Sequence, residues 1–313
     1  MSYLISVAIP TYNRADYLRE TIDAILNQSH PACEIIVVDD GSTDHTPDVL
    51  AGYGNKIKSI RIENSGAAIA RKTAAEASTC PWLAFCDSDD IWMPFHLERR
   101  VSLLKQHPDI NFSFSDLISF GDAAVPNRTY FSDAPENWWQ QFPKPDANNC
   151  IVMGTKAYRP FLRFNPGSPV TTVMTRELYN KIGGIDGRYS RMVAEDADMA
   201  RKAVLHGNVL CDLTATAKQR RHSGNMSAQV LQNLLGKCQI LENHIRLQVA
   251  PVELYDDIQA EIERTLHEAF LAAYYVNDFV AAKKIINHLD WRSLSVKNQL
   301  RFLKLFFTSL KNV

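Results

Sequence analysis

Apolar and polar residues alternate in blocks along the first hundred residues of the chain. Four short blocks have the length and apolar content of strands, at residues 4–9, 34–38, 57–62 and 82–86. The blocks between and after them carry apolar side chains at helical spacing, at residues 15–28, 46–50, 66–77 and 94–105. Strands that alternate with helices in this way predict right-handed crossovers and a doubly wound α/β sheet, mostly parallel and flanked by helices.

The pattern of apolar and polar residues becomes less regular after residue 110, and after residue 227 it is helical to the end of the sequence. Residues 111–169 hold one strand candidate, at 112–114, and are rich in Pro, Asn and aromatic residues, so we expect a substrate-facing loop region there. Regular elements are expected again as strands and helices, at residues 170–174, 176–182, 195–205, 209–211 and 215–219. The sequence therefore predicts an α/β domain over residues 1–227 and a helical region over residues 228–313.

Composition narrows the class of protein. The 313 residues are 46% hydrophobic and 22% charged with a formal net charge of −1, so no global positive field favours nucleic acid as a partner. The six cysteines form no C-x-x-C pair, which argues against a zinc site or a disulfide framework. The N-terminus lacks the basic start of a signal peptide, and no stretch reaches the roughly 20 apolar residues of a membrane helix. We expect a cytoplasmic protein.

Three carboxylates in one short segment are the most informative feature of the sequence. Asp87-Ser88-Asp89-Asp90 follows the apolar run at residues 82–86, at the end of a predicted buried strand. Carboxylates this close repel one another, and a hard divalent cation such as Mg²⁺ or Mn²⁺ relieves that repulsion while it keeps sites for phosphate oxygens. The alternative is an acidic surface turn that caps the helix after Pro94.

Other candidate ligands follow the first two strands. Tyr12, in the loop Pro10-Thr11-Tyr12-Asn13-Arg14, offers an aromatic face that can stack on a nucleobase, although the loop is also a plausible capped turn. Asp39 can accept a hydrogen bond from a base or a ribose hydroxyl, or can belong to a helix cap. Arg71 can meet a diphosphate, or can be a solvated surface side chain.

Two further polar clusters lie later in the chain. Glu195 and Asp196 open a predicted helix, where the helix dipole stabilises acids, but they can also supply the general base that a hydroxyl nucleophile needs. Arg220, Arg221 and His222 end a predicted strand and suit a leaving diphosphate or a metal ion.

Taken in order, these segments resemble the family 2 glycosyltransferases of the GT-A fold. The resemblance covers residues 7 to about 227. It rests on an ordered set of short motifs, namely VAIPTYNR at 7–14, IVVDDGSTD at 36–44, NSG at 64–66, AR at 70–71, DSDD at 87–90, GGID at 183–186, ED at 195–196 and RH at 221–222. One departure is Lys72, where an Asn commonly follows the Arg.

The resemblance assigns a role to each candidate residue. It implies that the nucleotide contacts Pro10, Thr11, Tyr12, Arg14, Asp39, Arg71, Asp87 and Ser88. It implies that Asp89 and His222 hold Mn²⁺ or Mg²⁺, with Asp90, Arg220 and Arg221 near the diphosphate. It also implies that Asp196 is the catalytic base and that Glu195 orients it or meets the acceptor. Residues 1–110 would then bind the nucleotide sugar, and residues 111–227 the acceptor.

The implied activity is an inverting transfer of a sugar from a nucleotide diphospho-sugar, UDP being the family's commonest nucleotide, to a hydroxyl acceptor. A glycan or lipid-linked acceptor of bacterial surface polysaccharide synthesis is expected by analogy. Alternatives are a nucleotidyltransferase and a non-catalytic nucleotide-sugar-binding protein. The helical region is expected to pack on the catalytic domain, to form a homodimer, or to make a peripheral contact with the inner face of the cell membrane, because residues 300–311 are amphipathic and basic.

Overall fold

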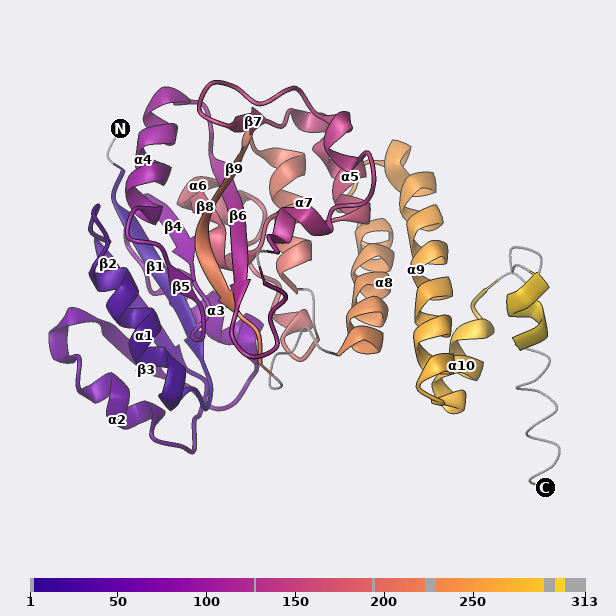
Figure 1. Ribbon diagram of the computed structural model, residues 1–313, viewed down its shortest axis with the longest axis horizontal. Coiled ribbons are helices and arrows are strands. Elements are labelled where there is room, and N and C mark those ends of the chain that lie inside the picture. Colours follow the sequence, from indigo (N-terminus) through magenta and orange to yellow (C-terminus); the bar gives the residue numbers. More distant parts are fainter. Residues whose placement is uncertain (1–2, 127, 193–194, 223–228, 290–295, 302–313) are drawn as a thin grey trace. The chain divides into compact units, whose positions relative to one another are not determined.

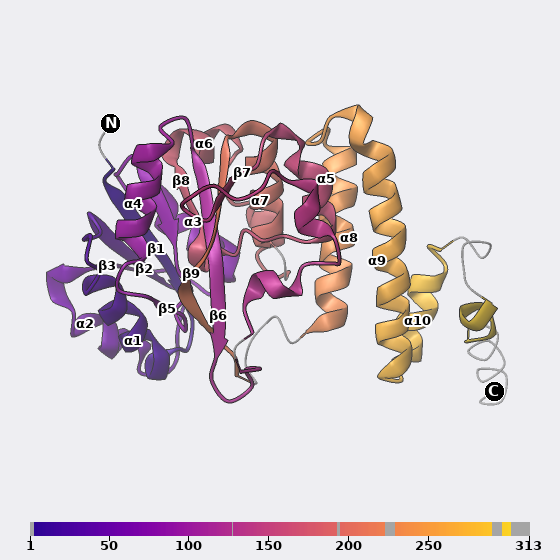
Figure 2. The same ribbon diagram turned by 45° about the horizontal axis from the view of Figure 1, so that its top comes forward.

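A computed structural model describes residues 3–126, 128–192, 195–222, 229–289 and 296–301 of the chain (Figure 1). The chain divides into two compact units. The first comprises Met1–Arg191 and Glu195–Asn225, and the second comprises Met192–Ala194 and Met226–Val313. The first unit contains the sheet and every candidate site residue, and the regular elements described in the second unit are helices (Figure 2).

Four parallel strands form one half of the sheet. They lie in the order β3 (Lys58–Arg61), β2 (Glu34–Asp39), β1 (Ile5–Thr11) and β4 (Trp82–Phe85). The strands expected at residues 4–9, 34–38, 57–62 and 82–86 are thus confirmed. Because all four run in the same direction, their carboxyl ends share one edge, and the loops that follow them converge there.

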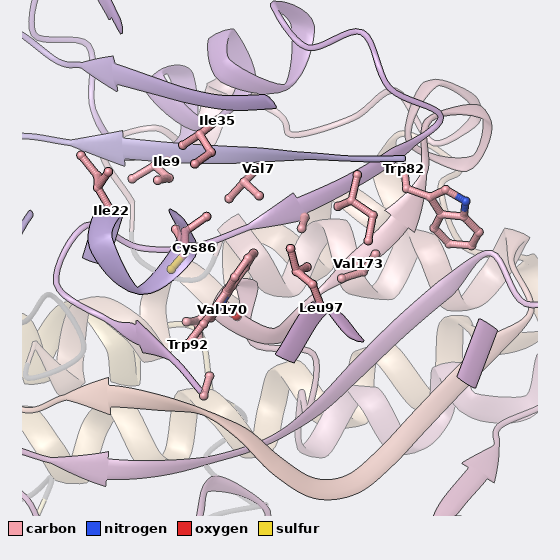
Figure 3. Close-up of a cluster of buried hydrophobic side chains, with 14 of the residues drawn as sticks. Val7, Ile9, Ile22, Ile35, Trp82, Cys86, Trp92, Leu97, Val170 and Val173 are labelled. Carbon is pink, nitrogen blue, oxygen red and sulfur yellow. Dashed lines mark hydrogen bonds between the residues drawn. The ribbon is translucent and has the colours of Figure 1, made fainter. Parts of the chain in front are cut away.

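Helices cover both faces of this half. α1 (Ala15–Leu26), α2 (Thr46–Ala51) and α4 (His96–Gln106) contribute apolar side chains to one core, whereas the alanines of α3 (Ala67–Glu76) pack on β1 and β2. In that core, Val7 and Ile9 of β1 lie with Ile22 of α1 and Leu97 of α4 (Figure 3). The alternation along β1 therefore serves two cores, as expected for a sheet with both faces buried.

The other half of the sheet is mixed. β8 (Val173–Thr175) runs antiparallel to both β4 and β6 (Phe112–Phe120), and β6 runs parallel to β9 (Val209–Arg220). β5 (Ile91–Trp92) and β7 (Cys150–Val152) are antiparallel to β9. Within the described residues, parallel pairing is therefore confined to the four strands β1, β2, β3 and β4 and to the pair of β6 with β9.

Strand β9 corrects one expectation. Separate strands at residues 209–211 and 215–219 were the prediction, but the two segments form one strand. The residues between them are accommodated by shifts in the pairing register with β6, on either side of Asp116. Such an irregularity lets a strand continue past residues that break its apolar alternation.

The link between β4 and β5 crosses the carboxyl edge of the sheet. Along the path of paired strands, β8, β6 and β9 lie between β4 and β5. Residues 86–90 make this connection and contain the acidic cluster. Trp92 of β5 is buried in the same core as β1, and its Nε1 donates to the Val170 carbonyl at 2.7 Å. The sheet therefore curls, and the acidic segment connects the central strand β4 to the edge strand β5.

The irregular region after residue 120 has buried aromatic side chains among many exposed residues. It contains η2 (Tyr130–Asp133), η3 (Trp138–Gln141), η4 (Thr155–Ala157) and α5 (Tyr158–Arg163). The Trp138 ring is almost fully buried against Phe161 and Phe164, and its Nε1 donates to the Pro160 carbonyl at 2.9 Å. A substrate-facing role for this region stays a prediction.

The remaining elements complete the two units. α6 (Arg176–Lys181) and α7 (Glu195–His206) belong to the first unit. The second unit contains α8 (Val230–Arg246), α9 (Tyr255–Tyr275) and α10 (Phe279–Ile286). The buried Glu261 carboxylate pairs with Lys237 of α8 and Arg264 of α9. None of the helices in the described part of the chain combines the length and apolar character needed to cross a bilayer.

Candidate functional site

The ends of β1 and β2 carry the first group of candidate residues. Pro10 and Thr11 end β1, and Thr11 lies beside Asp39 in the pairing register. Tyr12 follows with a side chain that is 44% exposed, which leaves its ring available for stacking. The Thr11 hydroxyl is buried and makes no hydrogen bond within the described residues. A buried hydroxyl without a partner is costly, so this atom is a candidate contact for a ligand.

Two acids at the end of β2 hold the surrounding loops: Asp39 is the last residue of the strand and Asp40 follows it. Asp39 accepts hydrogen bonds from the Ser42 amide at 2.8 Å and from the Arg61 guanidinium at 2.6 Å. Asp40 accepts from the amides of Ser65 and Gly66, at 2.7 and 2.8 Å. A carboxylate has about four lone-pair sites, so Asp39 keeps acceptor capacity for a ligand, although its side chain is only 2% exposed. Its contact with a base stays a prediction.

Arg71 connects the two acidic clusters. It lies on α3 and is buried, and its Nη1 and Nη2 each donate at 2.6 Å, to Glu195 of α7 and to Asp87 after β4. Its Nε is also buried and has no hydrogen-bond partner among the residues described. Arg71 is therefore an interior cation that joins the site, and the alternative of a solvated surface side chain is wrong.

Asp196 occupies a setting that suits a general base. It lies in the first turn of α7, next to Glu195, and its side chain is half-buried. Burial, reinforced by the negative charge of Glu195, raises the pKa of Asp196 to about 6, and the positive charge of Arg71 opposes that rise. A carboxylate with this pKa is ionised near neutral pH and is a better proton acceptor than an ordinary aspartate.

Asp89, Arg14 and His222 meet at the middle of the acidic segment. The Asp89 carboxylate lies 3.3 Å from Arg14 Nε and 3.1 Å from His222 Nε2. The described residues contain no cluster of three or more His, Cys, Asp or Glu side chains suited to hold a metal. Mg²⁺ and Mn²⁺ are commonly held by one or two protein ligands together with phosphate oxygens, so Asp89 and His222 fit such an ion in the presence of a diphosphate.

The other two residues of the acidic segment are buried. Ser88 is 6% exposed and Asp90 is 2% exposed. Burial, together with the negative charges of Asp89 and Asp87, raises the pKa of Asp90 well above its usual range. Its carboxyl group accepts from the Arg220 amide at 2.8 Å, so it fastens the segment to the end of β9.

Arg220 forms a clamp that the sequence did not reveal. Its guanidinium lies between the rings of Tyr17 and Phe120, with 4.7 and 4.5 Å to the ring centroids. Its Nη2 donates to Glu20 at 2.5 Å and its Nε donates to the Asp89 carbonyl at 3.0 Å. The guanidinium nitrogens Nε and Nη2, which were expected to contact a diphosphate, thus donate to protein oxygens. The contact of Arg220 with a ligand stays a prediction.

One face of α1 completes the clamp. Tyr17 stacks on the His222 ring with 5.1 Å between centroids, and the Thr21 hydroxyl donates to the Asp90 carbonyl at 2.8 Å. The same face of α1 carries Tyr17, Glu20 and Thr21, because residues three and four apart are neighbours on a helix. This spacing is the sequence signal that could have indicated that the three side chains contact one region of the protein. Arg221, between Arg220 and His222, donates its backbone amide to the Phe120 carbonyl at 2.7 Å.

Comparisons with known protein sequences give matches to the first unit. The model of the family described as glycosyl transferase family 2 matches residues 6–161. A putative teichuronic acid biosynthesis glycosyltransferase of Bacillus subtilis, TuaG, is 39% identical over 138 residues, which are 43% of this chain and 54% of that protein. An Escherichia coli protein, WfgD, is 35% identical over 116 residues, which are 36% of this chain and 46% of that protein. The match thus spans about half the length of these two relatives.

WfgD is described as a UDP-Glc:alpha-D-GlcNAc-diphosphoundecaprenol beta-1,3-glucosyltransferase. Two solved structures share the fold. S. aureus TarS 1–349 in complex with UDP-GlcNAc has a TM-score of 0.63 at 17% identity, with 96% of this chain and 79% of that chain covered. The mannosyltransferase PcManGT of Pyrobaculum calidifontis, in complex with GDP-Man and Mn²⁺, has a TM-score of 0.57 at 18% identity, with 98% and 86% covered. At these identities the likeness shows the fold, and it confirms the predicted GT-A arrangement.

Proposed function

We propose, from the premise that this chain belongs to glycosyl transferase family 2, that it transfers a sugar from a nucleotide diphospho-sugar to a hydroxyl acceptor with inversion at the anomeric carbon. The observation that carries the proposal is the buried bridge from Asp87 through Arg71 to Glu195, next to Asp196. Through this bridge, Asp87 of the predicted nucleotide-binding half and Glu195 of α7 contact the same arginine, and Asp196, the candidate base, is the next residue of α7. Two elements that are distant in sequence thereby share one reaction centre.

The chemistry follows from the charges at this centre. Asp196 accepts the proton of the acceptor hydroxyl while that oxygen attacks the anomeric carbon from the face opposite the departing diphosphate. Arg71 forms an ion pair with Glu195 and another with Asp87. Its remaining Nε–H is a donor for a ligand oxygen. Asp89 and His222 would hold Mn²⁺ or Mg²⁺, which supplies charge stabilisation to the leaving diphosphate.

The substrates are inferred by analogy. UDP is the proposed nucleotide, in keeping with the UDP-GlcNAc complex of TarS and the UDP-Glc in the description of WfgD. A metal requirement is supported by the donor set of Asp89 and His222 and by the Mn²⁺ complex of PcManGT. The descriptions of TuaG and WfgD support a role in the synthesis of cell-surface polysaccharide on a glycan or lipid-linked acceptor.

The test combines activity and binding. Asp196→Asn is expected to lower turnover of a nucleotide sugar by roughly 10²- to 10⁴-fold, because the general base is lost. Calorimetry should give an unchanged affinity for the nucleoside diphosphate, since Asp196 is not assigned to the nucleotide. Asp48→Asn, which neutralises an exposed acid on α2, is the matched control and should leave both quantities unchanged.

The products separate the alternatives. Release of a nucleoside diphosphate supports sugar transfer, whereas release of pyrophosphate would instead identify a nucleotidyltransferase. Equal turnover by Asp196→Asn and the parent protein would remove Asp196 from the mechanism. If no metal-dependent nucleotide binding is measured, the proposed function is wrong. A cytoplasmic location, a homodimer and packing of the helical region on the catalytic domain stay predictions.

A further inference from the structure

Positive charge is concentrated in the last part of the sequence. Residues 279–313 contain seven Lys or Arg and one Asp, which gives a net charge of +6. The preceding 278 residues contain 27 Lys or Arg and 34 Asp or Glu, which gives a net charge of −7. The near-neutral total therefore conceals two regions of opposite sign, and such asymmetry points to a partner of opposite charge for the basic region.

α10 places part of this charge opposite its packed face. Ala282, Ile285 and Ile286 are buried in the core of the second unit, which α9 also lines. On the other side of the helix, Val280 is 68% exposed and Lys284 is exposed one turn later. The outward side of α10 is therefore both apolar and basic.

The turn before α10 extends the apolar part. Val276, which follows the last residue of α9, is 70% exposed, and Phe279 at the start of α10 is 41% exposed. Asp278, between them, accepts a hydrogen bond from the Ala281 amide at 3.0 Å, so the acid at this turn acts as the cap of α10. Three exposed apolar side chains within five residues, at the turn between two helices, are unusual for a surface that faces only water.

Residues 296–301 lie against the same turn. The Arg301 guanidinium donates to the Tyr275 hydroxyl and lies over the Tyr275 ring, 5.0 Å from its centroid. Leu300, next to it, is 61% exposed, and Val296 is 72% exposed. Exposed apolar side chains thus occur on both segments, and the Arg301 cation connects the second segment to the end of α9.

We propose that this α9–α10 surface, made of Val276, Phe279, Val280, Lys283, Lys284 and Leu300, binds an anionic lipid bilayer. The apolar side chains would enter the boundary between headgroups and acyl chains, and the cations would meet lipid phosphates. Charge complementarity favours a bilayer over a second copy of this surface, because a symmetric dimer would place these cations against one another. The inference goes beyond sugar transfer and does not depend on it.

The test measures binding of the full chain to vesicles by flotation. Vesicles of phosphatidylcholine with 30% phosphatidylglycerol are expected to carry the protein at low salt, and pure phosphatidylcholine vesicles much less. A Val276→Asp and Val280→Asp double variant should bind at least about tenfold more weakly, because the apolar contact is replaced by two like charges. Lys283→Gln with Lys284→Gln should weaken binding roughly 30-fold at low salt and less in high salt.

Matched controls separate this surface from general effects. Val252→Asp changes a 74% exposed valine in η8 (Val252–Leu254), at the other end of α9, and should leave flotation unchanged. Lys56→Gln with Lys105→Gln removes two exposed charges from the first unit and should also leave it unchanged. Sugar transfer to a water-soluble acceptor should be equal in all these variants, which reports correct folding.

Three results would overturn the inference. The first is flotation that does not depend on phosphatidylglycerol. The second is equal loss of binding in the test variants and the control variants. The third is a dimer, measured by light scattering, that Val276→Asp with Val280→Asp converts to a monomer while the parent protein does not float; the surface would then be an interface between copies of the chain.

Discussion

Replacing Arg71 by Met tests both the stability and the electrostatics of the site. The guanidinium is buried and forms ion pairs at 2.6 Å with Asp87 and with Glu195. Loss of one partner of a buried pair costs about 3–5 kcal/mol, because the remaining charge stays desolvated. The Asp87 side chain is 30% exposed and regains some hydration, so we expect a loss of about 3 kcal/mol in the free energy of unfolding.

The same substitution should move the pH dependence of turnover. Arg71 holds down the pKa of Asp196, whereas Glu195 raises it, so removal of either group shifts the pKa in a known direction. Asp196 must be ionised to accept a proton, and turnover should therefore rise with pH through its pKa of about 6. Arg71→Met is expected to move this midpoint to higher pH, and Glu195→Gln to lower pH.

Chemical denaturation and pH-dependent initial rates measure the two effects. Lys72→Met is the matched control, because Lys72 adjoins Arg71 but is 40% exposed and only loosely paired with Glu76, so its loss should change stability by less than about 1 kcal/mol. Combining Arg71→Met with Glu195→Gln should recover part of the lost stability, since one unpaired charge is removed. Shifts of the pH midpoint in the same direction for Arg71→Met and Glu195→Gln would refute the reasoning.

Three further predictions test other parts of the structure. Tyr17→Leu should raise the Mn²⁺ concentration for half-maximal nucleotide binding by about threefold or more, because the ring that supports His222 is lost, whereas Tyr17→Phe should not; equal values in both variants would contradict this. Gly66→Ala should lower the melting temperature by several degrees, because φ is +92° and the new Cβ would lie 2.1 Å from the Ser190 carbonyl oxygen; an unchanged melting temperature would show that the backbone can move away. Glu261→Gln should destabilise the helical unit by about 3 kcal/mol, measured by denaturation followed by circular dichroism, and a loss below 1 kcal/mol would mean that its two ion pairs are weak.

The elements of the first hundred residues could be predicted because their signals are local. Apolar runs of strand length separated by helical spacing fix the order of strands and helices, and parallel strands direct their following loops to one edge. The approach of Asp39 and Asp87 to this edge follows from that topology. The sequence pattern does not predict β5 and β7, because short strands are defined by their partners in the sheet rather than by their own two or three residues.

The contacts within the site were harder to anticipate. Arg220 and Glu20 are 200 residues apart, and Arg71 and Glu195 are 124 residues apart, so no spacing in the sequence links them. The sequence around Arg71 also does not distinguish a buried arginine from one at the surface. The motifs predict which side chains carry chemistry, whereas the structure shows which of them hydrogen-bond to one another.

The short link between β4 and β5 limits how this site can be altered. Residues 86–90 leave six Cα–Cα steps between Phe85 and Ile91, which span at most about 20–22 Å when fully extended, and four strand spacings in a flat sheet require about 19 Å. The link nevertheless contains a turn, in which the Asp90 amide donates to the Asp87 carbonyl at 3.2 Å, so it draws the curled sheet closed. An inserted residue would slacken that closure and displace Asp89, whereas side-chain changes at constant length would leave it intact. Libraries intended to alter donor preference should therefore vary composition in this segment and never its length.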